Sequence, residues 1–243
     1  GEQVDPYLFL IHLRGIATED VHAHSRFDIA KVQLGVPAHP IQVGQLGFVH
    51  LARVKHRGDQ DFSAQLSRLR AIKPQPDVIF ISSYMPDLGT IIRSIREVGI
   101  TSPIMGGDSY DDPGLFEALG PKFGSDLYFV THTWMGPEAH PDMGSFIEAY
   151  KAYHGSPPDT SFVATGWDTI MLMAQAAEKA GSFDGAAIAK ALENNEFNLL
   201  TGKLSYRSAK EGHAPDKAAV LVSLTEGKPA FLGWRRPENP PAP

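Results

Sequence analysis

The chain has 243 residues, 42% hydrophobic and 21% charged, which is ordinary for a globular protein with a sizeable core. Its formal net charge of −6 argues against a nucleic-acid partner, because nucleic-acid surfaces usually carry a basic patch. Cysteine is absent, which excludes disulfides, thiol catalysis and cysteine-ligated metal sites. The chain starts without the features of a signal peptide, so a cytoplasmic protein and a mature exported one both fit.

Residues 1–58 show the least order. The runs "YLFLIHL" and "VHLARV" are candidate strands, but no periodic pattern joins them. His22 and His24 could share a metal only on a strand, where alternate residues share a face. The simpler interpretation is that both are surface histidines.

The clearest pattern lies in residues 59–131, where helices and strands alternate. "DQDFSAQLSRLRAIKP" has apolar residues at helical spacing, with Asp61 as a cap. A second helix follows Pro86, and a short third one lies around "PGLFEAL". The runs "DVIFI", "SPIMGG" and "DLYFV" are typical of buried strands. This alternation predicts a parallel α/β sheet.

The pattern changes after residue 131. Three successive helices are predicted, at 141–155, 160–180 and 184–195. Three short strands follow, at 202–206, 218–224 and 229–234, and the proline-rich tail, 235–243, is expected to be disordered. Trp167, Met171 and Met173 lie in the long helix, and we expect their side chains to pack in the protein core.

Polar side chains follow two of the predicted strands. Ser83 and Tyr84 come after "DVIFI", and Asp108 and Ser109 come after "PIMGG". Ligands of open α/β sheets collect at the carboxyl ends of strands, so these residues form a candidate binding site. A carboxylate beside an aromatic ring suits an ammonium group. The plain alternative is that Asp108 only caps the following helix or turn.

Other chemical interpretations are weaker. "GDS" is reminiscent of an esterase nucleophile, with Ser109 attacking, but His213 lacks the expected acid partner in the sequence. Asp108, Asp111 and Asp112 match no calcium-loop spacing. No phosphate-binding loop or dinucleotide fingerprint is present. The sequence therefore predicts no catalytic residue, no metal site and no cofactor.

Three stretches carry a family resemblance: "GDQDFSAQLSRLRAIKPQPDVIFISSYMPDLGTIIRSIREVGITSPIMGGDSYDDP", "SFIEAYKAYHGSPPDTSFVATGWDTIMLMAQAAEKAG" and "LTGKLSY". Together they resemble the periplasmic type I solute-binding proteins, and more narrowly the receptors for branched-chain amino acids that serve ABC transporters. The likeness covers roughly residues 59–225. It implies a type I periplasmic-binding-protein-like α/β fold, with parallel sheets, flanking helices and two lobes joined by a hinge.

The resemblance also implies how the chain is divided. Residues 59–130 would form the ligand-binding lobe, 131–200 the hinge and helices of the other lobe, and 201–234 the returning strands. The first half of the other lobe has no counterpart, so that lobe is expected to be incomplete, and residues 1–58 match poorly.

The same resemblance implies roles for individual residues. Tyr84 corresponds to an aromatic that packs on the bound amino acid, and Asp108 to the acid that receives its ammonium group. Ser83 and Ser109 line the same pocket, while Phe162 supplies an apolar contact from the other lobe. The hinge would consist of Thr131, His132, Thr133 and Trp134.

The function implied is capture of a small amino-acid-like solute by closure of two lobes. The partners implied are that ligand and the membrane subunits of an ABC permease, in a periplasmic or other extracytoplasmic location. One alternative is a ligand-sensing domain of a regulator with the same fold. The other is the Gly-Asp-Ser hydrolase.

Overall fold

The computed structural model describes residues 8–13, 47–53 and 61–236. The chain forms two compact units: unit 1 holds residues 1–130 and 222–230, and unit 2 holds 131–221 and 231–243. His22, His24 and residues 237–243 of the predicted disordered tail lie outside the described residues.

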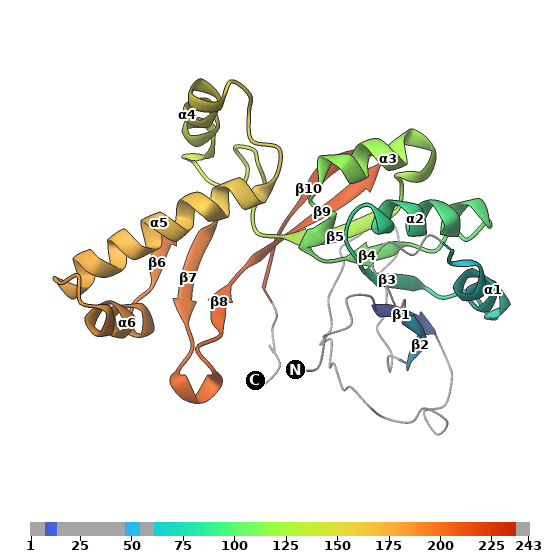
Figure 1. The fold of residues 1–243 in the computed structure, drawn as a ribbon, viewed down its shortest axis with the longest axis horizontal. Helices are drawn as coiled ribbons and strands as arrows, with labels where there is room; N and C mark the ends of the chain where they lie inside the picture. Colours follow the sequence, from blue (N-terminus) through green and yellow to red (C-terminus); the bar gives the residue numbers. More distant parts are fainter. Residues whose placement is uncertain (1–7, 14–46, 54–60, 237–243) are drawn as a thin grey trace. The chain divides into compact units, whose positions relative to one another are not determined.

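A seven-stranded sheet has the order β10-β9-β5-β4-β3-β1-β2 (Figure 1), and unit 1 holds most of it, while the first residues of β9 and the last of β10 belong to unit 2. Neighbours β3, β4 and β5 pair in parallel, which confirms the prediction from alternating helices and strands. Strand β1 pairs antiparallel with both β2 and β3, so the sheet is mixed. The strands are β1 (Leu8–Leu13), β2 (Gly47–Arg53), β3 (Val78–Ser82), β4 (Ile104–Gly106), β5 (Leu127–Thr131), β9 (Ala219–Thr225) and β10 (Lys228–Arg235).

Helices connect the parallel strands of unit 1, and α2 and α3 lie side by side on the sheet (Figure 1). The N-cap position of α1 is Phe62 rather than the predicted Asp61, although the Asp61 carboxylate accepts a hydrogen bond from the Ser63 amide at 3.0 Å. In α2 the leucine and isoleucines at helical spacing are fully buried, and Gly99 (φ 83°) follows its end. The helices are α1 (Ser63–Ala71), α2 (Asp87–Glu97), the short 3₁₀ turn η2 (Asp108–Tyr110) and α3 (Pro113–Phe123).

Unit 2 contains the three predicted helices, α4 (Met143–His154), α5 (Ser161–Ala180) and α6 (Gly185–Asn194). Its small sheet has the order β6-β7-β8 and pairs antiparallel. Strand β7 (Gly202–Tyr206) was predicted, whereas β6 (Phe197–Leu199) and β8 (Pro215–Lys217) were not, because neither "FNL" nor "PDK" is a continuous apolar run. The 3₁₀ turn η3 (Ala209–Glu211) lies between β7 and β8. Ala176 of α5 packs with Phe197 and Leu204 in a common core.

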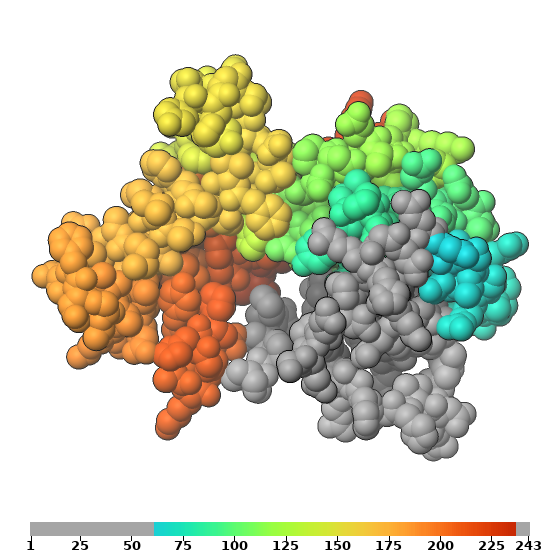
Figure 2. Space-filling model, viewed as in Figure 1, coloured from blue at the N-terminus to red at the C-terminus, as the bar shows by residue number. Residues whose placement is uncertain are grey.

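Some apolar side chains of the long helix α5 pack in the core of unit 2, and others stay exposed. Met171 packs against the core of unit 2, as expected. Trp167, Ile170 and Met173 are 52%, 70% and 45% exposed, so the expectation that Trp167 and Met173 lie in the core is wrong. Figure 2 shows α5 at the surface. Periodicity reveals an apolar face but not what covers it. Within the described residues, no helix is both long and apolar enough to cross a membrane.

Candidate functional site

The carboxyl ends of β3 and β4 carry the predicted ligand residues of unit 1. The two strands are parallel neighbours, with Phe80 opposite Met105. Ser83 and Tyr84 follow one strand, and Asp108 follows the other, so they project at one edge of the sheet. Tyr84 is 57% exposed, and Asp108 is exposed as well.

The loop that carries Tyr84 is held by the start of α2. The Tyr84 carbonyl accepts a hydrogen bond from the Leu88 amide at 2.9 Å, so its backbone belongs to the first turn of the helix. Leu88 is fully buried, which anchors this turn on the sheet. The ring of Tyr84 therefore stands exposed on a fixed backbone, as a contact for a ligand requires.

Ser83 differs from its neighbour because its side chain is 1% exposed. Its hydroxyl has no hydrogen-bond partner among the described residues. A buried hydroxyl without a partner costs about 1–3 kcal/mol. The Ser83 hydroxyl, next to the exposed Tyr84, is therefore a candidate for a hydrogen bond that forms only when a ligand or a water molecule binds.

Asp108 begins the 3₁₀ turn η2 directly after β4. The Asp111 amide donates to the Asp108 carbonyl at 2.9 Å, and the Tyr110 amide donates to the Gly107 carbonyl at 3.2 Å. The cap of α3 is instead Asp112, whose carboxylate accepts from the Gly114 amide at 2.7 Å. Asp108 therefore does not cap α3, and that half of the plain alternative is wrong, whereas a cap of the turn η2, which Asp108 opens, remains open.

Phe162 lies at the start of α5 in unit 2 and is 43% exposed. Its ring meets the His132 imidazole edge-on, with centroids 5.3 Å apart. The neighbouring Ser161 hydroxyl is 2.7 Å from that of Thr131, and both groups are buried. The first turn of α5 is thus tied to the segment 131–134, where the chain enters unit 2.

The segment 131–134 is also bound by Lys217 of β8. Its ammonium group donates to the His132 carbonyl at 2.9 Å and lies 5.8 Å from the centre of the Trp234 ring. Burial lowers the pKa of Lys217 to about 8, against the opposing charge of Asp168. Within the described residues, the buried Thr133 hydroxyl has no partner.

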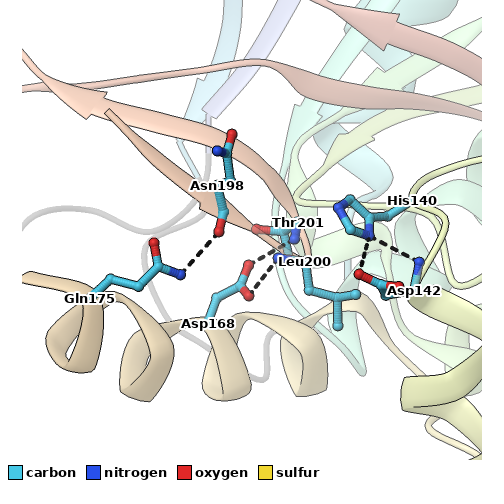
Figure 3. A network of polar contacts seen from close by, with 7 residues as sticks. All are labelled: His140, Asp142, Asp168, Gln175, Asn198, Leu200 and Thr201. Atoms are coloured by element: carbon cyan, nitrogen blue, oxygen red, sulfur yellow. Dashed lines mark hydrogen bonds and ion pairs between the residues drawn. The ribbon is translucent and has the colours of Figure 1, made fainter. Parts of the chain in front are cut away.

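Sequence reasoning missed one structural carboxylate, Asp168 on α5. Its two oxygens accept hydrogen bonds from the backbone amides of Leu200 and Thr201 at 2.9 and 2.8 Å, and Figure 3 shows these bonds. In the same figure Gln175 donates to the Asn198 carbonyl at 3.1 Å. The partners are main-chain atoms more than twenty residues away, so no spacing in the sequence could have revealed them.

A groove of about 740 Å³ opens on unit 2 beside α4 and α5. Tyr150 and His154 on its wall stack with ring centroids 4.1 Å apart. None of the predicted ligand residues lines it.

The geometry of the described residues does not support the hydrolase or the metal site. His213 pairs with Glu193 at 3.4 Å, in unit 2, while Ser109 belongs to unit 1. In the part of the chain that the structure describes, no three acidic or histidine side chains gather as metal ligands would.

Comparisons with known proteins agree with the fold. A family model described as periplasmic binding protein matches residues 33–229. The leucine-, isoleucine-, valine-, threonine- and alanine-binding protein of Pseudomonas aeruginosa is 27% identical over 149 residues, which is 61% of this chain and 38% of that protein.

Two solved structures are similar as well. A leucine binding protein from Thermotoga maritima has a TM-score of 0.65 and 34% identity, over 77% of this chain and 52% of that one. A branched-chain amino acid transporter substrate binding protein from Streptococcus pneumoniae, in complex with isoleucine, has a TM-score of 0.61 and 26% identity, over 74% of this chain and 50% of that one. The chain thus spans about half the length of these relatives, or less.

Proposed function

Because this chain belongs to the periplasmic binding protein family, we propose that it captures a small amino-acid-like solute outside the cytoplasm and delivers it to the membrane subunits of an ABC transporter. The observation that carries the proposal is the placement of Tyr84 and Asp108 after neighbouring parallel strands. One exposed carboxylate and one exposed ring share the edge where such folds bind ligands.

Each residue of this site has a chemical role in the proposal. The Asp108 carboxylate pairs with the ligand's ammonium group, and the face of Tyr84 covers the ligand, adding a cation–π contribution. The buried Ser83 hydroxyl donates to a ligand oxygen or to a bridging water. Ser109 lines the pocket through its backbone, and Phe162 supplies an apolar contact from unit 2.

Closure of the two units on the ligand is the proposed mechanism, with Thr131, His132, Thr133 and Trp134 as hinge. The boundary between the units falls between Val130 and Thr131, which supports this assignment. The anchoring of residue 132 by Lys217 gives the hinge a fixed end in unit 2. The chain then bends where it leaves unit 1.

Replacing Asp108 tests the proposed pairing. L-Leucine is the first probe, because a similar structure is that of a leucine binding protein. We expect Asp108→Asn to weaken leucine binding about tenfold to a hundredfold in isothermal titration calorimetry, because a charge-assisted hydrogen bond is lost. Asp77→Asn, an exposed aspartate directly before β3, is the matched control and should bind as the wild type does. Equal affinities for wild type and Asp108→Asn would refute the site.

A further inference from the structure

Tyr110 is a fully buried side chain at the end of η2, two residues after Asp108. Its ring stacks near Phe129 of β5, with centroids 6.1 Å apart and planes 29° apart. Burial raises the pKa of the Tyr110 phenol, so the group remains a neutral hydrogen-bond donor. The family resemblance assigns this residue no role.

The ring of Tyr110 lies where a side chain on β4 would otherwise be. A Cβ atom built on Gly106 would come within 2.0 Å of the ring, far inside van der Waals contact. Gly106 itself is buried. The glycine and the tyrosine therefore form an interlocked pair, in which the ring rests directly on the backbone of the strand that leads to Asp108.

The hydroxyl of Tyr110 reaches the neighbouring strand. It donates to the Ile81 carbonyl of β3 at 3.1 Å, and the Met105 carbonyl of β4 lies 3.5 Å away. Ile81 precedes Tyr84 by three residues, and Met105 precedes Asp108 by three. A single buried side chain thus touches both strands at the point where each leads into a proposed ligand contact.

From these contacts we propose that Tyr110 is a positioning residue, which fixes the Tyr84 loop and the Asp108 turn relative to each other and so sets the site's preference for a ligand bearing an ammonium group. The ligand part of this inference rests on the proposed function. The mechanical part, coupling of the two strand ends, does not.

Hydrogen–deuterium exchange on the ligand-free protein tests the mechanical part, with Tyr110→Phe keeping the ring and removing the hydroxyl. We expect the amides of residues 82–85, 87 and 88 to exchange about threefold faster or more, although they lie over twenty residues from the substitution. Tyr128→Phe on β5 is the matched control and should leave them unchanged. Unchanged exchange in Tyr110→Phe would overturn the inference.

The ligand part is tested by the ratio of two affinities, those for L-leucine and for 4-methyl-2-oxopentanoate, which lacks the ammonium group. We expect Tyr110→Phe to reduce the preference for leucine about five- to tenfold, because Asp108 is no longer held in place. Faster exchange with an unchanged ratio would show that Tyr110 only packs, and would overturn the positioning role. If the wild type binds neither compound, the proposed function fails, while the exchange measurement still decides whether Tyr110 couples the strands.

Discussion

At the scale of single residues, the sequence predicts the position of side chains that follow strands but not that of side chains that reach across them. Tyr84 and Asp108 could be placed at one edge because a parallel strand–helix–strand unit brings its strand ends together. The role of Tyr110 could not be foreseen, because its hydroxyl bonds a main-chain oxygen 29 residues away. Such a contact leaves no motif.

Because the Tyr110 ring rests on Gly106, adding a single methyl group at residue 106 should lower the stability of the protein. Gly106→Ala places a methyl group inside the ring, and overpacking of this kind destabilises by about 1–3 kcal/mol. Gly107→Ala is the matched control, because its Cβ would meet nothing within 4 Å and the backbone there is extended (φ −92°). Urea unfolding of both variants measures the difference. Equal stabilities would show that the ring does not rest on Gly106.

At the scale of elements, buried polar contacts fix how helices and strands of unit 2 join. Asp168 holds the turn after β6 to α5 through two backbone amides, and Lys217 holds the segment 131–134 to β8. The three helices were predictable from the sequence, two of them with a glycine at the end, whereas these links were not, since their partners are backbone atoms of distant residues.

Removing the Asp168 carboxylate should destabilise unit 2. Asp168→Ala leaves two buried backbone donors without their acceptor, at a cost of about 2–4 kcal/mol. The exposed Asp159 provides the matched control, and Asp159→Ala should shift stability by less than about 0.5 kcal/mol. Thermal unfolding followed by circular dichroism compares the two. A loss no larger than that of the control would mean that the carboxylate does not anchor the turn.

Lys217 predicts a pH dependence of stability. Its folded pKa of about 8 lies below its ordinary value of 10.5, so between these values the unfolded chain binds more protons. Stability should therefore rise as the pH increases from about 8 toward 10.5.

Melting temperatures between pH 7.5 and 9.5 check this rise, in a window below the ordinary titration of tyrosine. Lys217→Met keeps the aliphatic chain but has no titrating group. The melting temperature of the wild type should therefore rise more steeply with pH than that of the variant. Parallel slopes would contradict the burial of the ammonium group.

At the scale of the whole molecule, the fold class was predicted from the alternation of elements in residues 59–131 and from the family resemblance. The described structure and the family match confirm it. The exposure of Trp167, Ile170 and Met173 on α5 was not predicted, because an apolar pattern in a sequence does not show whether another surface covers it.

The measurement that tests the central claim most directly is native mass spectrometry of the protein purified free of ligand and then offered single amino acids. We predict a 1:1 adduct with L-leucine or another amino acid of similar size, much weaker for the matching 2-oxo acid and for Asp108→Asn. The ammonium-dependent pairing with Asp108 accounts for both losses. An intact chain that takes up no amino acid, or that binds the oxo acid equally well, would contradict the account.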